Sequence, residues 1–392
     1  MNFKVPFLGR AHKYTDEELE LIKEVAQNAI PLTQGKYLKE FEEKFSDYIG
    51  VKYSFGVCNA TAGLEMAAQL CQFKKGDEVI IPAHTFTASA YPFLKKGGII
   101  KWADIDFNER VVSLETIKKE ITDKTKAVVV VHLYGRIIPD IEDIAKFCKE
   151  NNIILIEDVA QALGTEINGK KAGSFGDISI FSFHSHKNIT TLGEGGMICT
   201  NNENYAKILP LLRHNGHTSW DFERDYYWQP AMGNVDLPQL NGEYLMPNNY
   251  SLGEVEAALG AKLLYRIDKI NEEKRKRAIY FIDEISKISN LLEFNKIENK
   301  EHNYHLLVAY VKKNRDDIMK KLAFEYKIQV IVQYYPLYRY DLYKKLGFSR
   351  ADVPNTDKFY DNMISFPFHH MMSDEEFEYM LESTKKVLKE FN

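Results

Sequence analysis

Cysteine is scarce in this chain of 392 residues. The four cysteines are far apart in sequence and none has Cys-x-x-Cys spacing: Cys58, Cys71, Cys148 and Cys199. This pattern excludes a disulfide framework and a cysteine-based zinc site. Three of the four lie in or beside apolar runs, so we expect reduced core thiols in a cytoplasmic protein.

An excess of positive charge and long apolar runs are also missing. The 51 basic and 56 acidic residues give a net charge of −5, which excludes the basic footprint of a nucleic-acid-binding protein. No apolar run approaches the ~20 residues of a membrane span, and residues 1–6 lack a signal-peptide core. Aromatic residues, in contrast, are plentiful, with 23 Tyr and 23 Phe. They fill a core or form a platform for a flat ligand, and composition does not distinguish the two.

Alternating strand and helix patterns begin near residue 53. Short β-branched runs predict strands at 53–57, 78–81, 99–102, 127–133, 153–156, 178–183 and 197–200. Helical patterns lie between several of them, as at 63–71 and 141–151. The four consecutive valines at 128–131 are apolar on both faces, as in a parallel sheet covered by helices. The sequence therefore predicts an α/β domain with a mostly parallel sheet.

Capping signals and a change of pattern suggest a second, smaller domain. Three helix starts have capping-box spacing: Thr15 with Glu18, Ser251 with Glu254, and Ser373 with Glu376. After Ser251, apolar residues recur every three or four positions to Ile270, which predicts one long amphipathic helix. Strand-like runs follow at 306–311 and 328–332. We predict a large domain at 1–250, with an N-terminal helical segment, and a small C-terminal α+β domain at 251–392.

Ligands of an open α/β sheet bind beyond the carboxyl ends of its strands, so the residues there are candidate site residues. After the first strand, small residues from Asn59 to Gly63 open a helix, whose free N–H groups and dipole favour a phosphate. The alternative is an ordinary turn with Thr61 as N-cap. After the second strand, Phe86 is a candidate for stacking on a flat ring, although a core Phe is the commoner case.

Two carboxylates, Glu157 and Asp158, follow four aliphatic residues, and Gln161 comes three positions later. We expect neither carboxylate to be a core residue. Asp158 is either a helix N-cap or a carboxylate that pairs with a cation on a ligand.

The strongest signal is Lys187, which follows an apolar strand and precedes the glycine-rich turn at 193–196. A nucleophilic lysine must be held rigidly and kept partly unprotonated. Lowering its pKa from ~10.4 to near 7 costs about 4 kcal/mol, and joining its nitrogen to a cofactor aldehyde as an imine removes that cost. A phosphate site, a ring platform, an acid for a ring nitrogen and this lysine are what a protein contributes to catalysis by pyridoxal 5'-phosphate (PLP).

These motifs, in this order, resemble the DegT/DnrJ/EryC1/StrS family of PLP-dependent sugar aminotransferases, which has the type I (aspartate aminotransferase) fold. The resemblance runs from residues 5–7 to 366–369 and includes segments 32–35, 59–64 and 157–162. It implies Thr61, Ala62 and Ser182 at the PLP phosphate. It also implies the following roles at the ring: Phe86 stacked on it, Asp158 on its nitrogen, Gln161 near its hydroxyl and Lys187 as the Schiff-base lysine.

The segment at 249–260 resembles the part of the family that contributes to the neighbouring subunit's site. Asn249 matches the asparagine that reaches the partner's phosphate, which implies a homodimer with shared active sites. The arginine usual two positions later is Ser251, which we interpret as an N-cap. At 333–338 the chain has Gln-Tyr-Tyr-Pro-Leu-Tyr where relatives often have His-Tyr-x-Pro-Leu-His, so a substrate-facing histidine is missing at both ends.

The resemblance implies that the enzyme moves the amino group of L-glutamate to a keto sugar, giving an amino sugar and 2-oxoglutarate. A nucleotide-linked keto-deoxysugar is favoured, and the spacing from Lys187 to Gly195 resembles enzymes acting on 3-keto sugars. The alternative substrate is a small phosphorylated ketose or keto-sugar phosphate. Lysine at 187 argues against a PLP-dependent sugar dehydratase, whose family members carry histidine there. It also argues against a non-catalytic PLP-binding regulator.

Two further features of the sequence concern a metal site and the mouth of the active site. His184 and His186 share a strand face, but no carboxylate or cysteine completes a metal-ligand set, so we expect no metal site. The segment 217–247 is unusually aromatic, and we expect it at the mouth of the active site, over a nucleotide base or a small ketose. Its aromatic residues are Trp220, Phe222, Tyr226, Tyr227, Trp228 and Tyr244.

Overall fold

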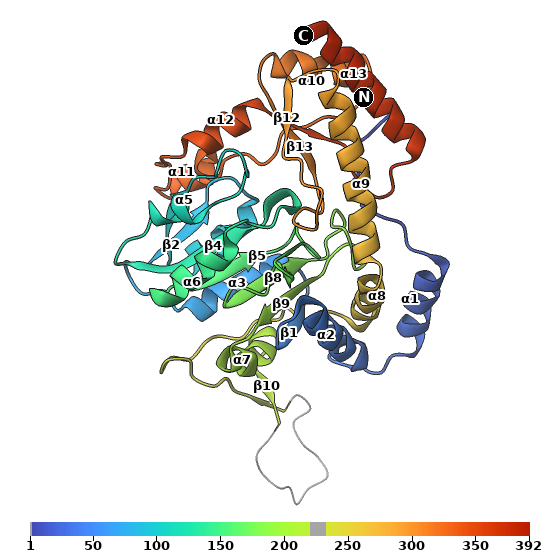
Figure 1. The fold of residues 1–392 in the computed structure, drawn as a ribbon. Coiled ribbons are helices and arrows are strands. Elements are labelled where there is room, and N and C mark those ends of the chain that lie inside the picture. Colours follow the sequence, from blue (N-terminus) through green and yellow to red (C-terminus); the bar gives the residue numbers. More distant parts are fainter. Residues whose placement is uncertain (1, 220–232) are drawn as a thin grey trace, which may run out of the picture.

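A seven-stranded sheet forms the centre of the computed structural model, which describes residues 2–219 and 233–392 (Figure 1). Its strands, in spatial order, are β1 (Tyr53–Val57), β9 (Gly196–Thr200), β8 (Ile178–Ser182), β5 (Ile154–Asp158), β4 (Thr125–Val131), β2 (Glu78–Pro82) and β3 (Ile99–Ala103). The strands from β8 to β3 pair in parallel, and β9 runs antiparallel to both of its neighbours. The predicted α/β fold with a mostly parallel sheet is confirmed.

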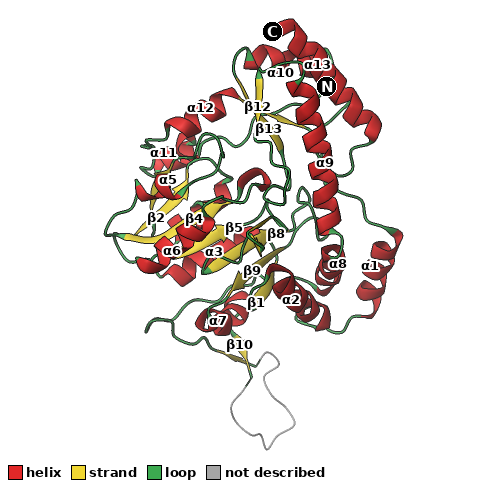
Figure 2. Cartoon of the chain, viewed as in Figure 1, coloured by secondary structure: helices red, strands yellow, loops and turns green. Residues whose placement is uncertain are grey.

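Helices cover both faces of this sheet (Figure 2). The valines of β4 show why the strand is apolar throughout: Val129 packs into the core that contains α3, whereas Val128 and Val130 pack into the core that contains α6. The helices before the C-terminal region are α1 (Asp16–Asn28), α2 (Lys36–Ile49), α3 (Ala60–Cys71), α4 (Tyr91–Lys95), α5 (Leu114–Lys118), α6 (Ile141–Glu150) and α7 (Glu203–Arg213). Short strand pairs are formed by β6 (Glu166–Ile167) with β7 (Lys170–Lys171) and by β10 (His217–Thr218) with β11 (Asn234–Val235).

The predicted long helix after Ser251 is instead two helices, α8 (Glu254–Leu264) and α9 (Ile267–Ser286). The N-cap of α8 is Gly253, so the interpretation of Ser251 as an N-cap is wrong. Glu254 does not close a capping box either. Its carboxylate is buried and accepts hydrogen bonds from the first amides of α2, those of Gly35, Tyr37 and Leu38, at 2.9, 2.9 and 3.2 Å. The capping boxes at Thr15 and Ser373 are confirmed.

The C-terminal region forms a second, antiparallel sheet of three strands, β12 (Leu292–Phe294), β13 (Leu307–Val311) and β14 (Met363–Phe366). Its helices are α10 (Arg315–Phe324), α11 (Asp341–Lys345), α12 (Pro354–Asn362) and α13 (Asp374–Phe391). The predicted strand at 328–332 is wrong, because this segment makes only isolated bridges, one of them between Ile328 and Val5.

The long helix α9 runs from the large sheet into this C-terminal region (Figure 1), whereas α8 packs on α1 and α2. The division of the chain at residues 250 and 251 stays a prediction. Among the described residues, no helix is long and apolar enough to cross a membrane.

Candidate active site

Lys187 and Asp158 lie near each other at the carboxyl edge of the large sheet. Asp158 is the last residue of β5 and is only 6% exposed. Its carboxylate accepts hydrogen bonds from Ser89 Oγ at 2.7 Å and from the Ala160 amide at 3.0 Å. Burial lowers the pKa of Lys187 to about 8, and the negative charge of Asp158 acts in the opposite direction. The structure therefore brings together the two residues to which the sequence assigned the chemistry.

The backbone holds Lys187 within a short loop between β8 and β9. The amide of Lys187 donates to the carbonyl of His184 at 2.8 Å, and the amide of Ser185 donates to that of Gly193 at 3.0 Å. Two glycines make the loop possible. Gly195 has a φ of +158°, and a Cβ there would lie 2.0 Å from Thr191 Oγ1, while a Cβ on Gly196 would lie 2.7 Å from the Ala60 amide nitrogen. The lysine loop is thereby packed against the start of α3.

The first turn of α3 fits a phosphate. Asn59, and not Thr61, is the N-cap, with its Oδ1 accepting from the Ala62 amide at 2.9 Å, so the alternative of Thr61 as N-cap is wrong. Amides of a first helical turn have no partner within the helix, and the helix dipole adds positive potential there. Thr61 is part-exposed in this turn, and Ser182, 9% exposed, ends β8. A phosphate at this position would compete with Asn59 for the Ala62 amide.

Phe86 presents its ring to solvent at the end of β2. It is 54% exposed, so the alternative of a core phenylalanine is wrong. Its ring meets the edge of Tyr334 at a centroid distance of 6.0 Å and an angle of 69°. Gln161 also contacts Tyr334: its Nε2 donates to the Tyr334 hydroxyl at 3.0 Å, and its Oε1 accepts from the Tyr134 amide at 2.7 Å.

Tyr334 was not identified as a site residue from the sequence. It lies in the segment 333–338, where the chain differs from the family pattern only at the two ends. The tyrosine itself matched that pattern, and this was the signal that could have pointed to it.

Glu157 corrects one expectation. Its side chain is fully buried, so the prediction that neither carboxylate is a core residue is wrong. Four hydrogen-bond donors compensate the buried charge: His132 Nε2 at 3.0 Å and the amides of Gly173, Phe175 and Gly176 at 2.9, 2.8 and 2.6 Å. Asp158 is buried too, but no helix starts there, so the alternative of a helix N-cap is also wrong.

Asn249 precedes a segment that pairs with the end of β1: the Cys58 amide donates to the Tyr250 carbonyl at 2.8 Å, and Ser251 forms a bridge with Val57. Asn249 is exposed and pairs with His214 in an antiparallel bridge, and His214 Nδ1 lies 2.9 Å from Ser251 Oγ. Within the described ranges, no hydrogen bond joins the Asn249 side chain to Lys187 or Asp158. Most of the predicted aromatic mouth, from Trp220 to Trp228, lies outside the described residues. Tyr244 is 64% exposed.

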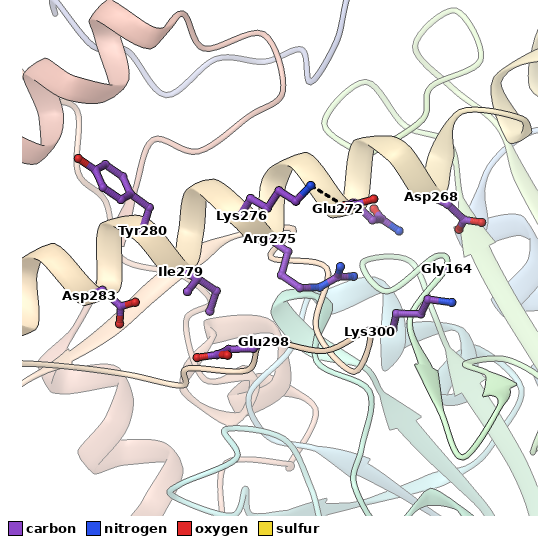
Figure 3. A pocket seen from close by; sticks show the side chains of 11 residues that line it. Gly164, Asp268, Glu272, Arg275, Lys276, Ile279, Tyr280, Asp283, Glu298 and Lys300 are labelled. Atoms are coloured by element: carbon purple, nitrogen blue, oxygen red, sulfur yellow. Dashed lines mark ion pairs between the residues drawn. The ribbon is translucent and has the colours of Figure 1, made fainter.

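A wide cleft elsewhere contains none of the predicted site residues. It has a volume of about 640 Å³ and runs along one side of α9, as Figure 3 shows. Opposite charges there are close together, such as Lys276 and Glu272, whose side chains form an ion pair at 2.5 Å. In the part of the chain that the structure describes, no group of three His, Cys, Asp or Glu side chains could hold a metal ion.

Comparison with known proteins decides the family. A family model described as the DegT/DnrJ/EryC1/StrS aminotransferase family matches residues 12–385. The chain belongs to this family. Among curated relatives, GDP-perosamine synthase of Vibrio cholerae is 31% identical over 340 residues, covering 86% of each chain. The dTDP-3-amino-3,6-dideoxy-alpha-D-galactopyranose transaminase of Aneurinibacillus thermoaerophilus is 30% identical over 388 residues, covering 97% of this chain and 99% of its own.

Solved structures agree with this assignment. PseC of Helicobacter pylori, an aminotransferase involved in the biosynthesis of pseudoaminic acid, superposes with a TM-score of 0.86 at 27% identity, covering 100% of both chains. The predicted type I fold is confirmed. The protein is a sugar aminotransferase with PLP as its cofactor. The site fits PLP: Asp158 retains acceptor capacity, Phe86 offers a bare ring face, and Lys187 is a desolvated amine.

Proposed function

We propose that this aminotransferase moves the amino group of L-glutamate to a nucleotide-linked keto-deoxysugar in two half-reactions, which yield 2-oxoglutarate and an amino sugar. One observation supports the chemistry above all: the desolvated amine of Lys187 beside the buried carboxylate of Asp158. PLP, when bound, supplies an electron sink for the carbon that loses its proton.

The roles of the chain's own groups follow from their positions. Lys187, with a pKa near 8, is suited to act as the general base that moves a proton between the substrate carbon and C4′ of the cofactor. Asp158, held by Ser89 and Ala160, keeps the ring nitrogen protonated. Phe86 stacks on the ring, and Gln161 lies near its hydroxyl. Thr61, Ala62 and Ser182 hold the phosphate.

The exposed position of Asn249 supports a homodimer in which this residue reaches the phosphate of the partner's cofactor. The four free cysteines, three of them buried, support a cytoplasmic protein. The names of two relatives, one a GDP-sugar and one a dTDP-sugar enzyme, support a nucleotide as the carrier and amino-sugar or polysaccharide biosynthesis as the context. The relative named as a 3-amino sugar transaminase agrees with the 3-keto preference suggested by the Lys187 loop.

The chemistry is tested with purified protein, Lys187→Ala and the matched control Lys276→Ala, which removes an exposed lysine of α9. The wild type and the control should show the visible absorption of lysine-bound PLP and form 2-oxoglutarate from glutamate when GDP- or dTDP-linked keto sugars are supplied. Lys187→Ala should lose both properties. A colourless wild type, full turnover by Lys187→Ala, or turnover only with small phosphorylated ketoses would contradict the proposal.

The shared site is tested by mixing two inactive variants, Lys187→Ala and Asn249→Ala. In a mixed dimer, one site combines an intact Lys187 from one chain with an intact Asn249 from the other. Activity should therefore return after subunit exchange, because one of the two sites in each mixed dimer is complete. If both residues served a site within one chain, no mixed dimer would contain a complete site, and activity would not return.

A further inference from the structure

A small cavity beside Lys187 is lined by several basic side chains. It has a volume of about 70 Å³, and its walls come from the N-terminal segment, the lysine loop, α9 and the C-terminal region. The basic side chains that line it are Arg10, His186, Lys187, Lys274, His305 and His369, and the phenol of Tyr334 lines it as well. Among the described residues, no aspartate or glutamate contributes to this wall.

Lys274 is the most unusual member of this set. It belongs to α9 and is only 4% exposed. Its Nζ donates to Asn188 Oδ1 and to the carbonyl of His305, both at 3.1 Å, and lies 5.5 Å from the centroid of the Phe368 ring. An ammonium group has three N–H donors, so one has no hydrogen-bond acceptor among the described residues.

Other lysines of α9 show what Lys274 lacks. Lys269 and Lys276 are exposed and pair with Glu273 and Glu272, at 3.9 and 2.5 Å. For Lys274, the described part of the chain provides no carboxylate within ion-pair distance, although a buried charge is expensive without a counter-charge. Burial accordingly lowers the pKa of Lys274 to about 7. A bound anion would supply the missing counter-charge.

Arg10 and the histidines complete the pocket in different ways. Arg10 is exposed, its Nε donates to the carbonyl of His12 at 2.9 Å, and its guanidinium carbon lies 4.9 Å from the centroid of the Tyr14 ring. The pKa of His369 is lowered by burial to about 4, and that of His305 lies well below the ordinary value for the same reason. Near neutral pH these two imidazoles are uncharged, so the cationic groups of the wall are Arg10 and the protonated fraction of Lys274.

We propose that this pocket binds the α-carboxylate of the amino donor, with Lys274 and Arg10 as its cationic contacts. The inference rests on the proposed function, in which the donor is an amino acid. The size of the cavity agrees, because it has room for a group as small as a carboxylate. Its position agrees too: Lys187 lines the same cavity, and the α-carboxylate is bonded to the carbon whose proton Lys187 takes.

The pocket is tested by calorimetric titration of the PLP-loaded protein with glutarate, a dicarboxylate that has neither an amino nor a keto group and does not react. Lys274→Met should weaken glutarate binding on the order of tenfold or more, because a charge-assisted hydrogen bond is lost. Lys274→Arg keeps the charge and should restore most of the affinity. The control Lys276→Met should bind as the wild type does. Visible absorption and thermal melting establish that each variant is folded and loaded.

Arg10→Gln is the second variant, since Arg10 is exposed and its loss should leave the fold intact. It should also weaken glutarate binding, and both variants should raise KM for glutamate without raising KM for the keto sugar. Glutarate binding that is absent in the wild type, or unchanged in folded Lys274→Met and in Arg10→Gln, would overturn the inference.

A parallel titration with inorganic phosphate separates the two sources of an anion. Binding of phosphate in preference to glutarate, lost in Lys274→Met, would assign the pocket to a substrate phosphate and also overturn the inference. Failure of the proposed function is a separate result. In that case glutarate binding would depend on Lys274 as expected, but no amino group would pass from glutamate to a nucleotide-linked keto sugar.

Discussion

The amine of Lys187 should capture PLP at neutral pH far faster than an ordinary lysine does. Burial lowers its pKa from 10.5 to about 8. At pH 7, about one tenth of the Lys187 side chains would then carry the neutral amine, on the order of 300-fold more than at an unshifted pKa. Only the neutral amine attacks the cofactor aldehyde, so this fraction sets the rate.

The rate can be followed by stopped-flow absorbance after PLP is added to protein stripped of cofactor, from about pH 6 to about pH 10. We expect it to rise about tenfold per pH unit and to level off above a midpoint near 8. Borohydride reduction followed by peptide mapping assigns the attachment to Lys187, and Lys187→Ala should give no labelled peptide at this position. A midpoint near 10.5, or labelling mainly elsewhere, would refute the reasoning.

Asp158→Asn tests the cause of the shift. The carboxylate of Asp158 raises the pKa of Lys187, against the larger effect of burial. Removing its charge should therefore move the midpoint of PLP capture below that of the wild type. Glu194→Gln is the matched control, since this carboxylate belongs to the same loop but its side chain is 63% exposed. A higher midpoint in Asp158→Asn, or an equal change in both variants, would contradict the assignment.

Three further outcomes are expected. Glu254→Gln should lower the free energy of unfolding by about 2–4 kcal/mol in denaturant titrations, because the buried, charged acceptor of three amide hydrogen bonds is lost, whereas Glu256→Gln should have little effect. Tyr334→Phe removes the hydroxyl that accepts from Gln161 and should weaken PLP retention several-fold in equilibrium dialysis, without unfolding the protein. Lys274 releases its proton near pH 7 in the folded state and near pH 10.5 in the unfolded state. Between these two values the unfolded chain binds more protons than the folded one, so Lys274 makes the free energy of unfolding rise with pH. Lys274→Met should flatten that rise in melting temperature, and an unchanged profile would contradict it.

The sheet could be predicted strand by strand because burial on both faces leaves a plain apolar signal. The strand ends could not be predicted as well. The apolar run of β5 stops at Ile156, but the backbone ladder with β4 continues through Val130 opposite Glu157 and Val131 opposite Asp158. Ladder hydrogen bonds do not depend on the side chain, so a strand can extend past its hydrophobic pattern.

The capping box predicted at Ser251 does not form because the fold places other hydrogen-bond donors beside the Glu254 carboxylate. The local pattern matched that at Ser373, yet Glu254 binds amides that lie more than 200 residues earlier in the chain. Ser251 meanwhile contacts His214. A four-residue pattern indicates which groups can form hydrogen bonds locally. It does not indicate which distant donors the fold brings close to the same carboxylate.

The adjacent carboxylates show the same limit at the active site. Neighbouring residues of a strand point to opposite faces, so Glu157 and Asp158 meet different surroundings although their sequence context is shared. A carboxylate has about four acceptor positions. In Glu157 all four positions are occupied, by His132 and by three amides of the 173–176 turn. Among the described residues, Asp158 accepts only from Ser89 and Ala160. Of the two carboxylates, Asp158 therefore has free acceptor positions for a ring nitrogen and Glu157 has none. The number of hydrogen bonds already accepted distinguishes the carboxylate that can bind a ligand from the one that stabilises the fold.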